Sequence, residues 1–94
     1  MEVTVEFAGL ARVLTRMPRV RLELDDTTTF QQILRLLGKQ HPELVGEVIS
    51  PTFDALKSSN MLNLNGKHMI QPGDMDRCTS DGDRLIMMSI LAGG

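Results

Sequence analysis

The chain has 94 residues, 41% of them apolar and 23% charged, which is the size and composition of one soluble globular domain. A net charge of −2 and the absence of Tyr and Trp argue against a nucleic-acid-binding protein. No apolar run is long enough to span a membrane and a single cysteine forms no internal disulfide, so we expect one cytoplasmic domain over residues 1–94 with no membrane partner.

Two stretches near the start of the chain, 2–7 and 19–24, alternate strictly between apolar and polar residues. A period of two predicts half-buried strands, and the closeness of the two stretches in sequence favours an antiparallel hairpin. No element is predicted for the short stretch between them, which contains Gly9 and ends at Pro18.

A helix is predicted after the second strand. Thr29 and Gln32 have the spacing of a capping box, and Thr28 with Gln31 is the alternative register. The apolar residues that follow at helical spacing are Phe30, Ile33, Leu34 and Leu37. A glycine and Pro42 bracket the end of this helix.

The second half of the chain returns mainly to strands. A short further turn of helix is expected over 43–49, whereas 52–61 carries no clear signal. Asn65-Gly66 lies between two extended runs and predicts a hairpin, and residues 84–91 are expected to form an apolar last strand. The order of elements predicts an α+β domain in which one helix crosses a mixed sheet.

Few residues have the spacing of catalytic or metal-binding groups. His41 and His68 lie far apart in sequence with no other ligand nearby, so each is interpreted as a solvated or capping residue. Cys78 has no activating base near it and is expected to be a semi-buried, inert thiol. The arginines between 12 and 21 lack interleaved aromatic residues and are interpreted as solvated. We expect no metal site and no tightly bound cofactor.

The end of the chain, Gly93-Gly94, has no evident structural purpose after an apolar strand. Without Cβ atoms a glycine tail can enter a narrow channel with its backbone extended, and three or four extended residues reach roughly 10–14 Å. Residues 91–94 are therefore expected to form an extended tail. Its reactive group would be the α-carboxylate of Gly94, activated by another protein.

Short motifs along nearly the whole chain resemble a known family. In order they are Phe7, Thr29, His41-Pro42-Glu43-Leu44, Asn65-Gly66, Asp81-Gly82-Asp83 and the terminal Ala92-Gly93-Gly94. Together they resemble the MoaD/ThiS family of sulfur-carrier proteins, which are relatives of ubiquitin, and most of all the small subunit of molybdopterin synthase. The resemblance implies a β-grasp fold, with about four to five strands crossed by one main helix. One departure is Ser89-Ile90, where many members have two prolines.

The resemblance also implies a chemistry for Gly94. An adenylating enzyme of the ubiquitin-activating type would use ATP to adenylate its carboxylate, and a sulfurtransferase would convert the adenylate to a thiocarboxylate. The thiocarboxylate would donate sulfur in cofactor biosynthesis, with molybdopterin favoured over thiamine and the large subunit of molybdopterin synthase as a further partner. The chain would not be an enzyme by itself. A protein modifier conjugated through Gly94 and a non-carrier interaction module stay as alternatives.

A docking face is predicted on the last strand. The register that covers the helix turns one set of residues toward it: Leu85, Met87 and Leu91. The opposite face then carries Ile86, Met88 and Ile90, unless the segment 44–61 folds over it. The family resemblance assigns docking contacts to Met88 and to His68, on the hairpin. The expected partner-binding residues are Met88, Ile86, Ile90, His68, Leu91 and Ala92.

Overall fold

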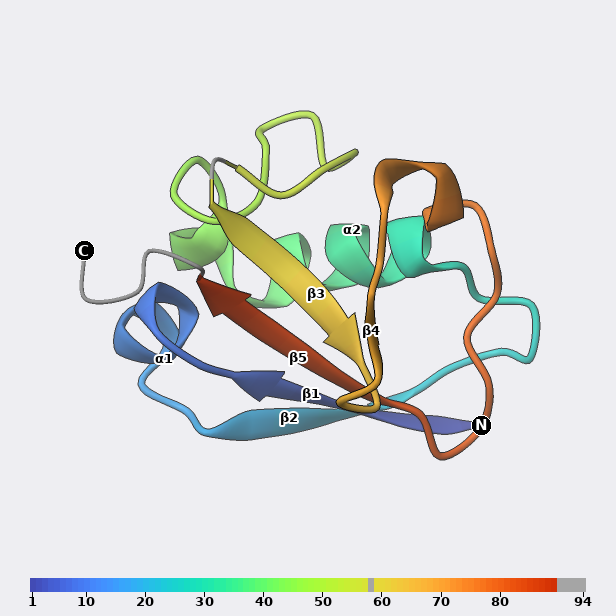
Figure 1. Ribbon diagram of the computed structural model, residues 1–94. Helices are drawn as coiled ribbons and strands as arrows, with labels where there is room; N and C mark the ends of the chain where they lie inside the picture. Colours follow the sequence, from blue (N-terminus) through green and yellow to red (C-terminus); the bar gives the residue numbers. More distant parts are fainter. Residues whose placement is uncertain (58, 90–94) are drawn as a thin grey trace.

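A computed structural model describes residues 1–57 and 59–89 and contains a five-stranded sheet crossed by one long helix (Figure 1). The strands are β1 (Glu2–Phe7), β2 (Arg19–Glu23), β3 (Asn60–Leu64), β4 (His68–Met69) and β5 (Arg84–Ser89). Their order in the sheet is β2-β1-β5-β3-β4. The central pair β1–β5 is parallel and the other pairs are antiparallel, which confirms the predicted α+β class with a mixed sheet.

The predicted hairpin of β1 and β2 is present, with Val3 opposite Leu22. The stretch between the strands, however, forms a six-residue helix, α1 (Leu10–Thr15), that the sequence did not reveal. It starts at Gly9 without a side-chain cap, and Gly9 has φ 62° and ψ −131°, a conformation that residues with a Cβ rarely adopt. A helix this short, without a capping residue, gives almost no sequence signal.

The main helix, α2 (Phe30–Gln40), begins as the first of the two capping registers predicted. The Thr29 hydroxyl accepts the Gln32 N–H at 3.2 Å, and the Gln32 side-chain oxygen accepts the Thr29 N–H at 2.8 Å. The helix ends at His41, whose N–H donates to the Leu37 carbonyl at 2.7 Å. His41 is thus a capping residue, as predicted.

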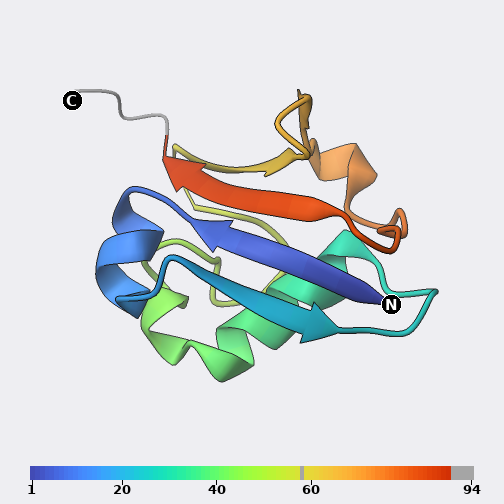
Figure 2. The ribbon, with the colours of Figure 1, turned by 90° about the horizontal axis from the view of Figure 1, so that it is seen from below.

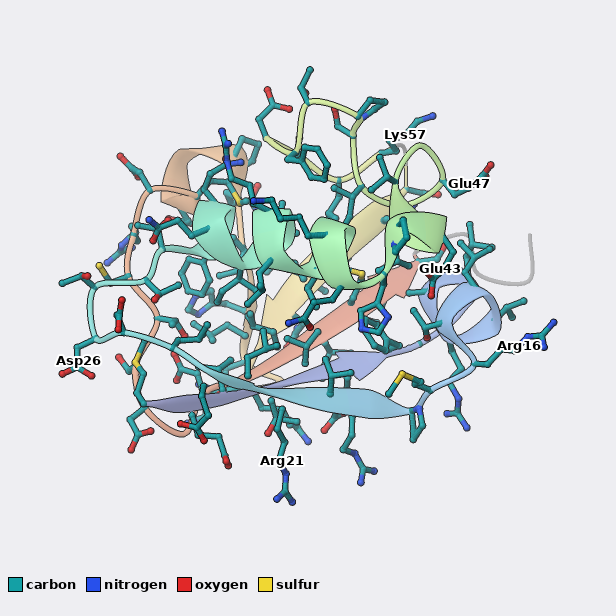
Figure 3. All side chains as sticks on the ribbon, turned by 180° about the vertical axis from the view of Figure 1, so that it is seen from behind. Arg16, Arg21, Asp26, Glu43, Glu47 and Lys57 are labelled. Atoms are coloured by element: carbon teal, nitrogen blue, oxygen red, sulfur yellow. The ribbon has the colours of Figure 1, made fainter. Side chains whose placement is uncertain are left out.

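The segment after α2 folds over the end of the helix rather than over the sheet. The turn of helix expected over 43–49 is only a 3-10 helix, Pro42–Leu44, and the following chain is held by Val48 and Ile49, which are fully buried. Phe53 packs on Gly38 of α2. The segment therefore belongs to the helix side, which is the near side in Figure 3.

The core lies between α2 and one face of the sheet. Its residues are Val3, Val5, Phe7, Ala11, Leu22, Phe30, Ile33, Leu34, Leu37, Leu44, Val48, Ile49, Leu62, Leu85 and Met87. Leu85 and Met87 have no exposed surface, which confirms the register predicted for them. Leu91, expected on the same side, lies outside the described residues. The opposite face of the sheet has no helix over it among the described residues, as the two views of Figures 1 and 2 show.

The hairpin of β3 and β4 turns at Asn65-Gly66, as predicted. Both residues have a left-handed backbone, with φ 57° and 72°, which a type I′ turn requires. Lys67 completes the loop, so that His68 lies opposite Leu64. The inclusion of Lys67 in the loop decides which side of the sheet each residue of β4 occupies.

Candidate docking face

Strand β5 alternates between the core and the opposite face of the sheet. Ile86 and Met88 are half-buried on that opposite face, as predicted. In the register of the sheet, Met61 of β3 lies opposite Met88, and Asn63 lies opposite Ile86. Asn63 in turn lies opposite Met69 of β4. Residues directly opposite one another share a face, so the sheet gathers four apolar side chains. We call them the apolar face: Met61, Met69, Ile86 and Met88.

A polar residue, Asn63, lies within this apolar face. Its side-chain amide donates to the Met69 sulfur at 3.6 Å. Its amide oxygen is buried and accepts no hydrogen bond from any residue that the structure describes. An unsatisfied buried oxygen costs about 1–3 kcal/mol of folding free energy, so stability does not explain this residue.

Charged residues border the apolar face along β1. Arg84, at the start of β5, forms an ion pair with Glu6 at 3.5 Å, and Glu6 lies opposite Arg19 of β2. Because both side chains are partly exposed to solvent, this pair contributes little to stability. Methionine side chains within a charged border are typical of surfaces that bind other proteins.

The end of β5 is held beside the start of α1 (Figure 1). The Ala8 N–H donates to the Met87 carbonyl at 2.9 Å. A Cβ on Gly9 would lie 3.4 Å from the Cβ of Ser89, the last residue described. The end of β5 therefore lies against Gly9. The predicted site residues beyond this point lie outside the described residues: Ile90, Leu91, Ala92, Gly93 and Gly94.

His68 is not on the apolar face. It lies opposite Leu64, whose own partner across the sheet is the core residue Leu85, so His68 belongs to the helix side. There it lines a pocket of about 210 Å³ together with Phe30 and Cys78. The structure thus separates His68 from Met88. The residue of β4 that shares the face of Met88 is Met69, which was not among the predicted site residues.

Cys78 is exposed, which corrects the expectation of a semi-buried thiol. It lies opposite Thr29 at the start of α2, and its thiol donates to the Thr27 carbonyl at 3.5 Å. The segment that contains Cys78 connects β4 to β5 and passes the start of α2, and this path leaves Cys78 on the surface. Over residues 1–57 and 59–89, no cluster of His, Cys, Asp or Glu is placed to hold a metal ion.

Asp83 fixes the turn that leads into β5. Its carboxylate accepts hydrogen bonds from the Thr79 hydroxyl at 2.9 Å, the Ser80 N–H at 2.8 Å and the Asn65 amide at 3.1 Å. Burial raises the pKa of this carboxyl, but the hydrogen bonds from Ser80, Asn65 and Thr79 outweigh burial and hold the pKa below its ordinary value. One charged group thereby ties the β3–β4 hairpin to the start of β5.

Comparison with known proteins gives matches in structure only. No protein-family model matches the sequence, and neither does any curated protein.

No helix in the described part of the chain is both long and apolar enough to cross a bilayer.

Several solved structures share the fold over essentially the whole chain. SAMP1 from Haloferax volcanii is 20% identical, with both chains covered completely and a TM-score of 0.82. Urm1 from Trypanosoma brucei is 25% identical over 99% of this chain and 95% of that chain, with a TM-score of 0.73. The complex of subunits 1 and 2 of molybdopterin-converting factor from Helicobacter pylori contains a chain that is 19% identical, with both chains covered completely and a TM-score of 0.62. The chain therefore has the β-grasp fold of the ubiquitin-like proteins, and its structural neighbours are of the kind that its sequence motifs resemble, the MoaD/ThiS sulfur carriers and their relatives.

Proposed function

We propose that this protein is a sulfur carrier that docks on its partner enzymes through the apolar face and presents Gly94 to their active sites. The observation that carries the proposal is the course of β5. β5 displays Ile86 and Met88 on the side of the sheet that no helix covers over residues 1–57 and 59–89, and Gly93-Gly94 follow this strand closely in the sequence. A partner bound to this face would lie next to Ser89, the last described residue before the proposed tail.

In the proposed reaction the chain supplies the carboxylate and its partners supply the catalytic groups. A Gly94 carboxylate oxygen attacks the α-phosphorus of ATP, and pyrophosphate leaves. A sulfurtransferase persulfide then attacks the acyl carbon and displaces AMP. A second thiol then attacks the sulfurtransferase cysteine sulfur of the resulting acyl disulfide. The S–S bond breaks, the second thiol and that cysteine end as a disulfide, and the thiocarboxylate keeps the transferred sulfur. Gly93-Gly94 suits a narrow active-site channel because neither residue has a side chain.

We further propose that the sulfur acceptor is molybdopterin, with a molybdopterin-synthase large subunit as the partner. Support comes from the similarity to a chain in the complex of subunits 1 and 2 of molybdopterin-converting factor. Thiamine, or another product, stays the alternative acceptor.

A second candidate function is protein modification, in which the activated Gly94 forms an isopeptide bond with a lysine of a target protein. The observation that favours it is the fold similarity to the small archaeal modifier protein 1 of Haloferax volcanii, with a TM-score of 0.77. Both functions need the same adenylated tail, so only the product distinguishes them.

Intact-mass spectrometry after incubation with an activating enzyme, ATP and a persulfide-loaded sulfurtransferase separates these functions. A carrier gains about 16 Da, because one carboxylate oxygen is replaced by sulfur. A modifier instead appears in conjugates that withstand denaturation and reduction. An unchanged mass, together with an absence of conjugates, would contradict both functions.

A further inference from the structure

The outer edge of β2 pairs with no other strand over residues 1–57 and 59–89, and its hydrogen-bonding groups alternate in a regular way. β2 lies at the margin of the sheet, where β1 is its single neighbour among the described strands (Figure 2). The Met1 amine donates to the Leu24 carbonyl and the Leu24 N–H donates to the Met1 carbonyl, each at 2.7 Å. In an antiparallel pair such exchanges alternate along the strand. Leu22 therefore directs its backbone groups toward β1, whereas Arg21 and Glu23 direct theirs outward.

Three charged side chains of β2 point to the face of the sheet away from α2. Arg19, Arg21 and Glu23 are exposed on the face away from α2, and Figure 3 shows Arg21 pointing away from the helix. None of the three forms an ion pair with a residue in the described ranges. Glu23 also lies opposite Glu2 in a pair that exchanges no backbone hydrogen bonds, where cross-strand side chains are closest. Like charges there are unfavourable.

We propose that β2 pairs with β2 of a second copy of this chain, antiparallel, around a two-fold axis at Leu22. Arg21 then lies opposite Glu23 of the second copy, and the symmetry forms this pair twice. Both residues direct their backbone groups outward, so each pair exchanges two hydrogen bonds as well as a charge interaction. Glu23 thereby gains the cation that it lacks beside Glu2.

The rest of the edge agrees with the same register. Val20 lies opposite Leu24 of the second copy on the helix side, and both are half-buried apolar residues already in contact with the core. Arg19 lies opposite Asp25, which is exposed and beyond the end of the strand. Opposite charges thus meet on one side of the joined sheets and apolar residues on the other.

Other antiparallel registers bring like charges together. Backbone groups that point outward can pair only with one another, so the two-fold axis must pass through one residue of the strand. An axis at Val20 places Arg19 opposite Arg21, and an axis at Arg21 or at Glu23 places that residue opposite itself. An axis at Leu24 pairs Glu23 with Asp25. The axis at Leu22 is the one that forms opposite-charge pairs throughout, so the sequence specifies a register.

The proposed pairing is independent of the carrier function. β5 is separated from β2 by β1, so the second copy would not cover the apolar face. Two joined sheets would present two apolar faces on the same side.

Sedimentation equilibrium on the complete chain, at low salt and over a range of concentrations, tests the pairing. We expect the wild-type chain to dimerise reversibly. Arg21→Glu and Glu23→Arg should each weaken self-association at least ten-fold, because each places like charges opposite one another. When the two variants are mixed, opposite charges meet again and a heterodimer should form with an affinity close to that of the wild type.

Matched controls change the same charges elsewhere. Lys67→Glu and Glu47→Arg alter exposed residues outside β2 and should leave self-association within two-fold of the wild type. Circular dichroism verifies that each variant is folded. A wild-type chain that stays monomeric at millimolar concentration overturns the pairing. So does a mixture of the two variants that remains monomeric, and so does equal weakening by the control variants.

Discussion

Among single residues, Asp83 is the clearest source of pH-dependent stability. Its pKa is lowered in the folded protein, so its contribution is complete above the pKa of the unfolded chain, about 3.9, and is lost as the pH falls through the lower folded value. We expect Asp83→Ala to lower the free energy of unfolding by about 1–3 kcal/mol at pH 7, because three donors lose their acceptor. Urea unfolding at pH 7 and near pH 2.5 should show this difference narrowing in acid. A difference that is as large in acid would be contrary to the assigned role.

Gly38 should respond to substitution in the opposite way to most helix glycines. Replacing an interior helix glycine with alanine normally stabilises a protein by about 0.5–1 kcal/mol. Here an added Cβ would lie 2.3 Å from the Phe53 ring, so we expect Gly38→Ala to destabilise the protein by about 1–3 kcal/mol. Thermal unfolding measures the effect. In a double-mutant cycle with Phe53→Ala the penalty should disappear, and a penalty that persists would locate the strain elsewhere.

Among the elements, those that were predictable from the sequence have strong local signals. The alternation in β1 and β2, the capping box at Thr29 and the turn at Asn65-Gly66 all appear where expected. Helix α1 was missed because it lacks a capping side chain and exposes apolar residues such as Val13, which is 69% exposed. Packing against β1, β5 and the 3-10 helix Pro42–Leu44 stabilises α1, whereas its own sequence carries no clear helical pattern.

The candidate site was predictable only where a local sequence pattern determines which face of the sheet a residue occupies. The alternation in β5 assigns Ile86 and Met88 to one face because the core needs the other residues of the strand. Which residues of β4 face the helix depends on whether the hairpin loop ends at Gly66 or at Lys67. The Asn65-Gly66 motif alone does not determine the length of the loop. One residue of difference moves His68 to the helix side and brings Met69 beside Asn63.

The placement of Met69 and His68 on opposite faces of the sheet leads to a prediction about the binding of an activating enzyme. Met88→Asp and Met69→Asp should each weaken binding by about 2 kcal/mol or more, as expected for a central apolar anchor. His68→Asp, the same substitution on the same hairpin, should have little effect because His68 faces the helix side. Isothermal titration calorimetry measures all three affinities. Unchanged affinity of Met88→Asp would remove this residue from the interface, and equal weakening by His68→Asp would contradict the assignment of faces.

On the scale of the whole molecule, the body and the tail should be separable. The core is formed by α2, the sheet and the chain around Val48 and Ile49, all within the described residues. Removing one residue from the end of the chain should therefore leave the melting temperature unchanged. The same deletion should abolish sulfur loading if Gly94 carries the reactive carboxylate.

The central claim is that the end of the tail carries the sulfur, and the most direct test is intact-mass measurement of the Gly94 deletion variant beside the wild-type chain. Both are incubated with activating enzyme, ATP and a persulfide-loaded sulfurtransferase, with Cys78→Ser as the control for a thiol-bound sulfur. We expect wild type and Cys78→Ser to gain about 16 Da, and the deletion variant to gain nothing while melting normally. A deletion variant that loads like the wild type, or a Cys78→Ser variant that fails to load, would contradict the account.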